Sequence, residues 1–170
     1  MPNMKSIINA HNKKILSPNQ IDPNQKTCNC NQKDTCPLQQ NCLSTSLIYE
    51  ATLKSEPNNE KKYIGLCQNT FKKRYNNHKS SLNLERYKNN TTLSTEFWKL
   101  KEDNKHPTIT WKIIRHAHVY TPESNKCNLC LNEKYEIANY PGENLLNKRT
   151  EIIAKCRHKR KYELAQCSPG

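Results

Sequence analysis

Two short segments decide the fold of this 170-residue chain: Leu47-Ile-Tyr-Glu-Ala-Thr-Leu53 and Lys62-Tyr-Ile-Gly-Leu-Cys67. Residues 46–53 alternate apolar and polar side chains, as a half-buried strand does, and residues 62–67 form a second strand-like run. The intervening residues 54–61 contain Pro57 and paired asparagines, which are typical of a hairpin loop. We therefore expect an antiparallel hairpin that places Tyr49 and Tyr63 on neighbouring strands.

Helical patterns follow this hairpin. Asn69 or Thr70 can cap a helix in which Phe71, Tyr75 and Leu82 supply an apolar stripe. Arg74 and His78 are expected to share the other face of this helix. A second short helix is expected to open at Ser94 or Thr95, and a last one to be capped near Asn147. The predicted helices span about residues 70–82, 94–100, 127–139 and 148–156, and a third strand spans residues 109–119. The sequence thus predicts an α+β fold in which a small three-stranded antiparallel sheet is flanked by helices.

The composition favours a polyanionic partner. The chain has 28 basic and 15 acidic residues, a formal net charge of +13, and a pI near 9.4. Nucleic acid is the leading candidate, although nucleotide bias in the source genome can account for part of the surface lysine. Only 34% of the residues are hydrophobic and the mean hydropathy is -1.03, so the core must be small. No stretch is apolar enough to span a membrane or to serve as a secretory signal, and we interpret the protein as intracellular.

Cysteine spacing divides the chain and predicts metal binding. We interpret residues 1–27 as a linker, 28–45 as a cysteine-rich extension and 46–165 as the main domain. Four soft ligands close in sequence suit tetrahedral zinc, and a Cys-x-x-Cys with a Cys-x-His suits a second ion. In one alternative, Cys36 and Cys42 bind a single ion together with Cys127 and Cys130. In another, the cysteines are reduced and buried and bind no metal. The first predicted set is Cys28, Cys30, Cys36 and Cys42, and the second is Cys127, Cys130, Cys156 and His158.

An ordered set of residues resembles a known family. Leu-Ile-Tyr at 47–49 and Tyr-Ile-Gly at 63–65, followed by Arg74, His78 and Glu133, resembles the GIY-YIG endonucleases. The likeness runs from about residue 28 to residue 164. The sequence most resembles the domains at the C-terminus of Penelope-like retroelements. Three motifs carry this likeness: Cys-Pro-Leu at 36–38, Leu-Cys-Leu-Asn-Glu-Lys at 129–134 and Cys-Arg-His at 156–158. One departure is Leu47, which stands where the family has the first glycine of its motif.

The resemblance implies a role for each matched residue. Tyr49 would be the general base, its phenol pKa lowered by lysines or a metal, and Tyr63 would position water and phosphate. Arg74 and His78, one helical turn apart, would bind the scissile phosphate. Glu133 would hold Mg²⁺ or Mn²⁺. Without the resemblance, the two tyrosines suit cross-strand aromatic packing. Arg74 and His78 then suit an ordinary surface helix face, and Glu133 suits a solvated glutamate. Asn147 matches the family's late asparagine.

The expected function is hydrolytic nicking of DNA. In retroelements of this kind the nick supplies a 3′ hydroxyl for reverse transcription, so the resemblance implies fusion to an upstream reverse transcriptase and a nuclear location. Basic residues at 72–74 and 155–161 are candidate phosphate contacts, and the latter run equally suits a nuclear-localisation patch or a solvated face. Two alternatives stay open: a free-standing GIY-YIG nuclease of the repair or homing type, and a zinc-stabilised DNA-binding module without catalysis.

Overall fold

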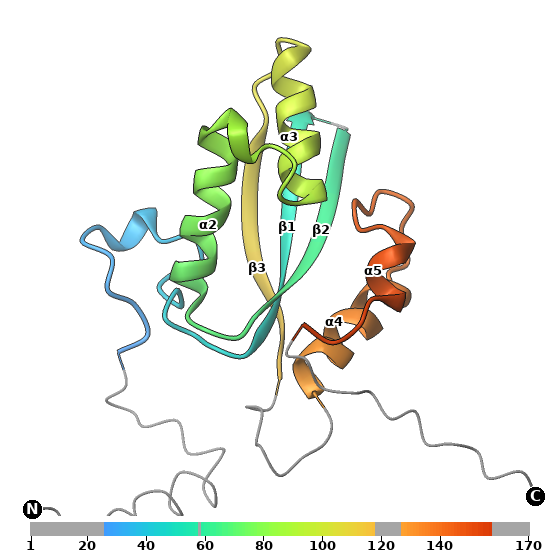
Figure 1. Cartoon of the computed structure of the whole chain (residues 1–170). Coiled ribbons are helices and arrows are strands. Elements are labelled where there is room, and N and C mark those ends of the chain that lie inside the picture. The colour runs from blue at the N-terminus through green and yellow to red at the C-terminus, as the bar shows by residue number, and fades with distance from the viewer. Residues whose placement is uncertain (1–25, 58, 118–126, 158–170) are drawn as a thin grey trace, which may run out of the picture.

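A three-stranded antiparallel sheet forms the centre of the computed structural model, which describes residues 26–57, 59–117 and 127–157 (Figure 1). Strand β1 (Leu47–Glu56) lies between β2 (Asn59–Cys67) and β3 (Thr108–His116). The predicted α+β class, with its small antiparallel sheet, is thereby confirmed. Residues 118 and 119 of the predicted third strand lie outside the described residues, as do residues 1–25 of the predicted linker.

The β1–β2 hairpin is longer than its apolar pattern predicted. Pairing continues past the alternating region to Glu56 opposite Asn59, with an irregularity between Lys54 and Glu56. Lys54 and Glu60 are cross-strand partners whose charged groups lie 3.2 Å apart. Cross-strand pairs of opposite charge stabilise a ladder without any apolar alternation, so hydropathy alone ended β1 too early and began β2 too late.

Helices cover the sheet on both sides. Helices α2 and α3, green to yellow in Figure 1, lie over one face, whereas α4 and α5, orange to red, lie beside β2. None of the helices in the described part of the chain is long and apolar enough to cross a membrane. The helical elements are η1 (Lys33–Thr35), α2 (Phe71–Asn83), η2 (Glu85–Tyr87), α3 (Thr92–Glu102), α4 (Asn128–Ala138) and α5 (Arg149–Ile153).

The boundaries of two helices, α3 and α5, differ from the prediction. Helix α3 begins at Thr92, before the expected Ser94 or Thr95, because Thr91 and Ser94 form a reciprocal capping box. Helix α5 ends at Ile153, so Cys156 lies outside it, and its N-cap is Lys148 rather than Asn147. The asparagine side chain that was expected to cap α5 binds the sheet instead.

The alternation along β1 builds two cores. Leu47, Tyr49 and Leu53 point toward α2 and α3, where Leu38 of the cysteine-rich extension joins the same cluster. Ile48 points to the opposite face, toward α4. Leu47, which stands where the motif that the sequence resembles has a glycine, is wholly buried in the first cluster. The departure from the motif is therefore accommodated as an ordinary core side chain.

The outer edge of β2 is covered by the segment that precedes α5. The Lys62 backbone N–H donates to the Asn144 carbonyl at 2.8 Å, and the Leu146 N–H donates to the Lys62 carbonyl at 2.7 Å. An edge strand otherwise presents unpaired N–H and C=O groups, and covering it prevents pairing with other chains. This cover also brings residues from the far end of the chain to the side of Tyr63 and Gly65.

Candidate functional site

The Tyr49 hydroxyl is the centre of a buried hydrogen-bonded group beneath α2. Arg74 donates its Nε–H to this hydroxyl at 3.0 Å, and His78 Nε2 lies 2.7 Å from it. Because Arg74 can only donate, the hydroxyl oxygen accepts that bond, and its own proton is left for His78. Tyr49 therefore donates to Nε2 of a neutral imidazole.

Helix α2 turns this pair toward the sheet, not away from it. The buried residues of α2 are Phe71, His78 and Ser81, whereas Tyr75 and Leu82 of the predicted apolar stripe are only half-buried. The prediction that Arg74 and His78 share the face away from the apolar stripe is wrong. The sheet offers a buried hydroxyl that satisfies the imidazole, so a polar residue can occupy a core position.

Gly65 makes room for this arrangement. It is the cross-strand partner of Tyr49, and a Cβ at residue 65 would lie 2.5 Å from the Tyr49 hydroxyl oxygen and 2.6 Å from the adjacent ring carbon. It would also lie 3.1 Å from the Tyr63 ring. Any larger residue at position 65 would push Tyr49 away from Arg74 and His78. The glycine is thus required for close approach, rather than for an unusual backbone angle.

Tyr63, Arg74 and His78 line a pocket of about 640 Å³ next to Tyr49. The Tyr63 ring packs edge to face with the His78 ring at a centroid separation of 6.0 Å. Tyr49 itself is not part of the lining and lies behind His78 and Arg74. The remaining lining residues are Asn77, Ser80, Ser81, Tyr87, Asn90, Thr91, Glu151 and Arg157.

Glu133 reaches this group from α4, across the edge of β2. Its Oε1 accepts the Leu66 backbone N–H at 3.1 Å and lies 3.2 Å from Nη2 of Arg157. Burial raises the pKa of Glu133, and the positive charges of Arg157 and Arg74 oppose that rise. The Glu133 carboxylate does not line the pocket, but its charge is close enough to act on Tyr49 and Tyr63.

Asn147 and Glu151 complete the site on the β2 side. The Asn147 side-chain amide makes two hydrogen bonds with the backbone of Ile64. Oδ1 of Asn147 accepts the Ile64 N–H at 2.7 Å, and Nδ2 donates to the Ile64 carbonyl at 2.8 Å. Nδ2 also donates to Oε2 of Glu151 at 2.6 Å. Sequence reasoning missed Glu151, which lines the pocket. Its one available signal was the spacing, since residues 147 and 151 are four apart, as on one helical turn.

Burial governs the protonation of the tyrosine and the histidine. Burial raises the pKa of Tyr49, the neighbouring Tyr63 adds to this rise, and Arg74 opposes it. The sequence predicts that lysines or a metal lower this pKa; the side-chain cation beside the phenol is instead Arg74, and burial outweighs its charge. Burial, followed by the charge of Arg74, lowers the pKa of His78 to about 3. Both groups are therefore neutral at pH 7.

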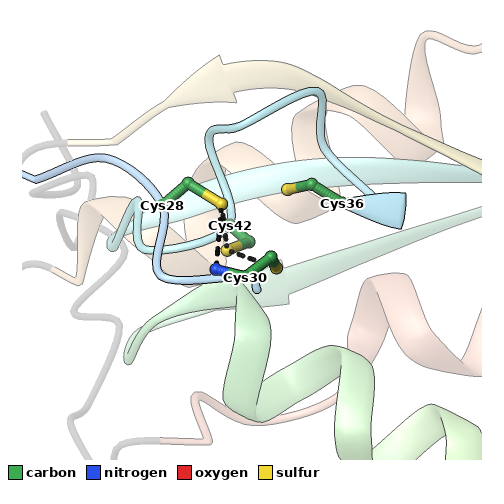
Figure 2. Close-up of side chains that lie close together, drawn as sticks. All are labelled: Cys28, Cys30, Cys36 and Cys42. Atoms are coloured by element: carbon green, nitrogen blue, oxygen red, sulfur yellow. Dashed lines mark hydrogen bonds between the residues drawn. The ribbon is translucent and has the colours of Figure 1, made fainter. Parts of the chain in front are cut away.

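The cysteine-rich extension gathers four thiols, as predicted (Figure 2). Their sulfur atoms all lie within 4.8 Å of one another, and Cys42 Sγ lies 3.5 Å from Cys28 Sγ and 3.7 Å from Cys30 Sγ. Tetrahedral zinc with Zn–S bonds of about 2.3 Å separates its sulfurs by about 3.8 Å. This cluster could hold a metal such as zinc.

Backbone N–H groups support the fourth thiol, Cys36. Gln39 and Gln40, in the turn that follows Cys36, have positive φ values of 48° and 69°. Burial opposes ionisation of Cys36, but hydrogen bonds from the Leu38 and Gln40 backbones lower its pKa to about 7. Thiolate is the form that binds metal, so this turn favours ligation.

The extension also caps α2. The Lys72 N–H donates to the Cys42 carbonyl at 2.7 Å, and the Phe71 N–H donates to the Ser44 carbonyl at 2.9 Å. Thr70 is the N-cap residue as expected, but its side chain makes no capping hydrogen bond. Carbonyls of the cysteine-rich extension thus satisfy two of the free N–H groups at the start of the helix that carries Arg74 and His78.

The second cluster contains three of its four predicted members. Cys127, Cys130 and Cys156 place their sulfurs within 4.8 Å of one another, with Cys156 Sγ and Cys130 Sγ 3.7 Å apart. This cluster could also hold a metal. The fourth predicted ligand, His158, lies outside the described residues. The alternative in which Cys36 and Cys42 share an ion with Cys127 and Cys130 is wrong, because the two sets form separate clusters.

Comparison with known proteins returned no relative. No protein-family model, curated protein or solved structure matches the chain.

We predict that each cysteine cluster binds one zinc ion. Cys42→Ser should lose the ion of the first cluster and lower the melting temperature, because a serine hydroxyl is a poor zinc ligand. Cys67→Ser is the matched control, since Cys67 is a buried thiol outside both clusters. Elemental analysis and thermal unfolding of protein purified without chelator provide the measurement. Equal zinc content in wild type and Cys42→Ser would contradict the assignment.

We predict that His78 makes the protein acid-sensitive. The unfolded chain protonates this imidazole near pH 6.5, whereas the folded protein does so only near pH 3. The resulting stability is fully present above pH 6.5 and is lost as the pH falls toward 3, with a limiting slope of about 1.4 kcal/mol per pH unit.

Urea unfolding of His78→Gln between pH 7.5 and pH 4 should therefore show a shallower loss of stability than wild type. His106→Gln, at an exposed histidine, should keep the wild-type slope. Identical slopes for wild type and His78→Gln would show that His78 does not stay neutral in the folded protein.

Proposed function

We propose that this chain is a metal-dependent DNA endonuclease domain of the GIY-YIG type, which nicks DNA by phosphodiester hydrolysis. The observation that carries the proposal is the way in which the Arg74 guanidinium is held at the pocket. Its Nε is held by the Tyr49 hydroxyl, while its terminal nitrogens make no hydrogen bond within the described residues and its side chain lines the pocket. A guanidinium fixed at one end and open at the other suits a phosphate oxygen.

The Tyr49 and His78 pair supplies a path for the proton of the attacking water. Burial disfavours a phenolate at Tyr49, so a mechanism that needs a free phenolate is disfavoured too. Because Tyr49 lies behind His78 and Arg74 rather than in the pocket lining, the attacking water would have to reach it between these two side chains; Tyr49 would then accept the water proton while it gives its own proton to Nε2 of His78. The imidazole would then carry the charge, which burial opposes and the negative charge of a phosphate in the pocket would favour, and Tyr63 at the pocket wall would orient the water or the phosphate. The water oxygen would form the new bond to phosphorus as the bond between phosphorus and the 3′ oxygen breaks, and the leaving oxygen would take up a proton from solvent to give a 3′ hydroxyl.

The carboxylates suit a hard divalent cation. Oε2 of Glu133 and Oε1 of Glu151 have no hydrogen-bond or ion-pair partner among the described residues, and the two carboxylates lie near enough for their charges to interact. Mg²⁺ and Mn²⁺ prefer such oxygen ligands. Glu133 would hold the ion, which when bound supplies positive charge to the phosphate and the leaving oxygen.

DNA is the substrate class that the charge of the chain favours. With a net charge of +13, and with Arg74 and Arg157 facing the pocket, the protein suits a polyanion. The resemblance to Penelope-like retroelements extends the proposal: the nick would prime reverse transcription by an upstream polymerase domain of the same polypeptide, in the nucleus. A catalytically inactive DNA-binding module is the competing function, and a plasmid assay separates the two.

We predict that Glu133→Gln abolishes nicking of supercoiled plasmid in Mg²⁺ or Mn²⁺ but leaves DNA affinity nearly intact. Glutamine keeps an oxygen for the Leu66 N–H and removes the charge that holds a cation. Glu136→Gln, on the same helix and also paired with an arginine, should nick at the wild-type rate. Gel analysis of open circles measures the rate. Undiminished nicking by Glu133→Gln would end the metal-ligand role.

We predict that Arg74→Lys lowers both nicking and DNA affinity by about tenfold or more. Lysine keeps the positive charge but cannot bind Tyr49 through one nitrogen and a phosphate through two others. Lys73→Ala, at the adjacent exposed position, controls for general loss of positive charge. Wild-type rate and affinity in Arg74→Lys would contradict the bidentate phosphate contact.

A further inference from the structure

The ion pair between Glu133 and Arg157 joins a fixed carboxylate to a movable guanidinium. The Arg157 side chain is 46% exposed, whereas the Glu133 side chain is 6% exposed. The Glu133 oxygen that contacts Arg157 also accepts the Leu66 backbone N–H, which holds it against β2. If this ion pair opens, Arg157 is therefore the partner that moves.

The backbone next to Arg157 is anchored near Glu133. Arg157 follows Cys156, whose sulfur lies 3.7 Å from that of Cys130, and Cys130 is three residues before Glu133 on α4. The guanidinium also lines the pocket, together with Arg74 and Tyr63. A change of side-chain torsion alone could thus carry Arg157 from the carboxylate to an anion in the pocket.

We infer that Arg157 exchanges partners: it pairs with Glu133 in the metal-free protein and binds a DNA phosphate when a divalent cation is held by Glu133. This inference rests on the proposed function. A cation at Glu133 removes the attraction of the carboxylate for Arg157 and adds repulsion between like charges. The phosphate on Arg74 is then the anion within reach, and two guanidinium groups share the pocket.

The exchange couples the binding of metal and DNA. Glu133 is partly neutralised by Arg157 until a cation replaces the guanidinium, and Arg157 contributes to DNA affinity only after it is released. By thermodynamic linkage, the divalent cation and the DNA each strengthen the binding of the other. Arg74, which is tied to Tyr49 rather than to a carboxylate, contributes in both states.

The test measures binding of a fluorescent DNA duplex by anisotropy, in chelator-free buffer without added divalent cation and in Ca²⁺, at constant ionic strength. Arg157→Ala should match wild type within about twofold without Ca²⁺ and bind about tenfold more weakly in Ca²⁺. Arg115→Ala is the matched control: Arg115 pairs with Glu136 of the same helix, is 48% exposed and does not line the pocket. It should match wild type within about twofold in both solutions.

A second pair of variants tests the exchange itself. In a Glu133→Gln background Arg157 no longer pairs with a charged group at position 133, so adding Arg157→Ala should weaken binding without Ca²⁺ as well. An equal loss for Arg157→Ala with and without Ca²⁺, or no loss in either, would overturn the inference. These outcomes are distinct from failure of the proposed function, which would appear as wild-type protein that binds the duplex but does not nick plasmid in Mg²⁺ or Mn²⁺.

Discussion

The Tyr49 hydroxyl, held between Arg74 and His78, is the interaction on which the rest of the site depends. A phenol can lie wholly buried at this place only because Gly65, opposite it on β2, has no side chain. The buried hydroxyl in turn fixes the guanidinium by its Nε and gives the buried imidazole a proton donor. The buried hydroxyl of Tyr49 and the buried imidazole of His78 are stable in a core position because each finds a hydrogen-bond partner within the group.

The cysteine-rich extension packs against the main domain and helps to position the same site. Its Leu38 enters the core beneath α2, and the Cys42 and Ser44 carbonyls satisfy the first N–H groups of that helix. A metal ion on the four thiols would fix these carbonyls in place. The orientation of α2, and with it the position of Arg74 and His78, therefore depends on a segment that supplies no catalytic group.

On the other side of β2, the side chains that bind the edge of the sheet are also candidates for the chemistry of the site. Glu133 and Asn147 bind the backbone of Leu66 and Ile64, and so close the free edge of the sheet. The same contacts bring a carboxylate near Tyr63, with Glu151 held beside it by Asn147. These residues would be required for folding even without catalysis, which is why variants that keep the hydrogen bond but remove the charge separate the two roles.

The sequence by itself determined the hairpin, the α+β class, the i, i+4 spacing of Arg74 and His78, and the two groups of cysteines. These are local properties, set by alternation, turn residues and ligand spacing within one element. Only the tertiary structure decided that α2 turns His78 into the core, that the cysteine groups stay separate, and that Glu133 and Glu151 meet Tyr63 across the edge of β2. Such placements depend on which long-range partner satisfies a buried polar group, and no periodicity within one segment contains that information.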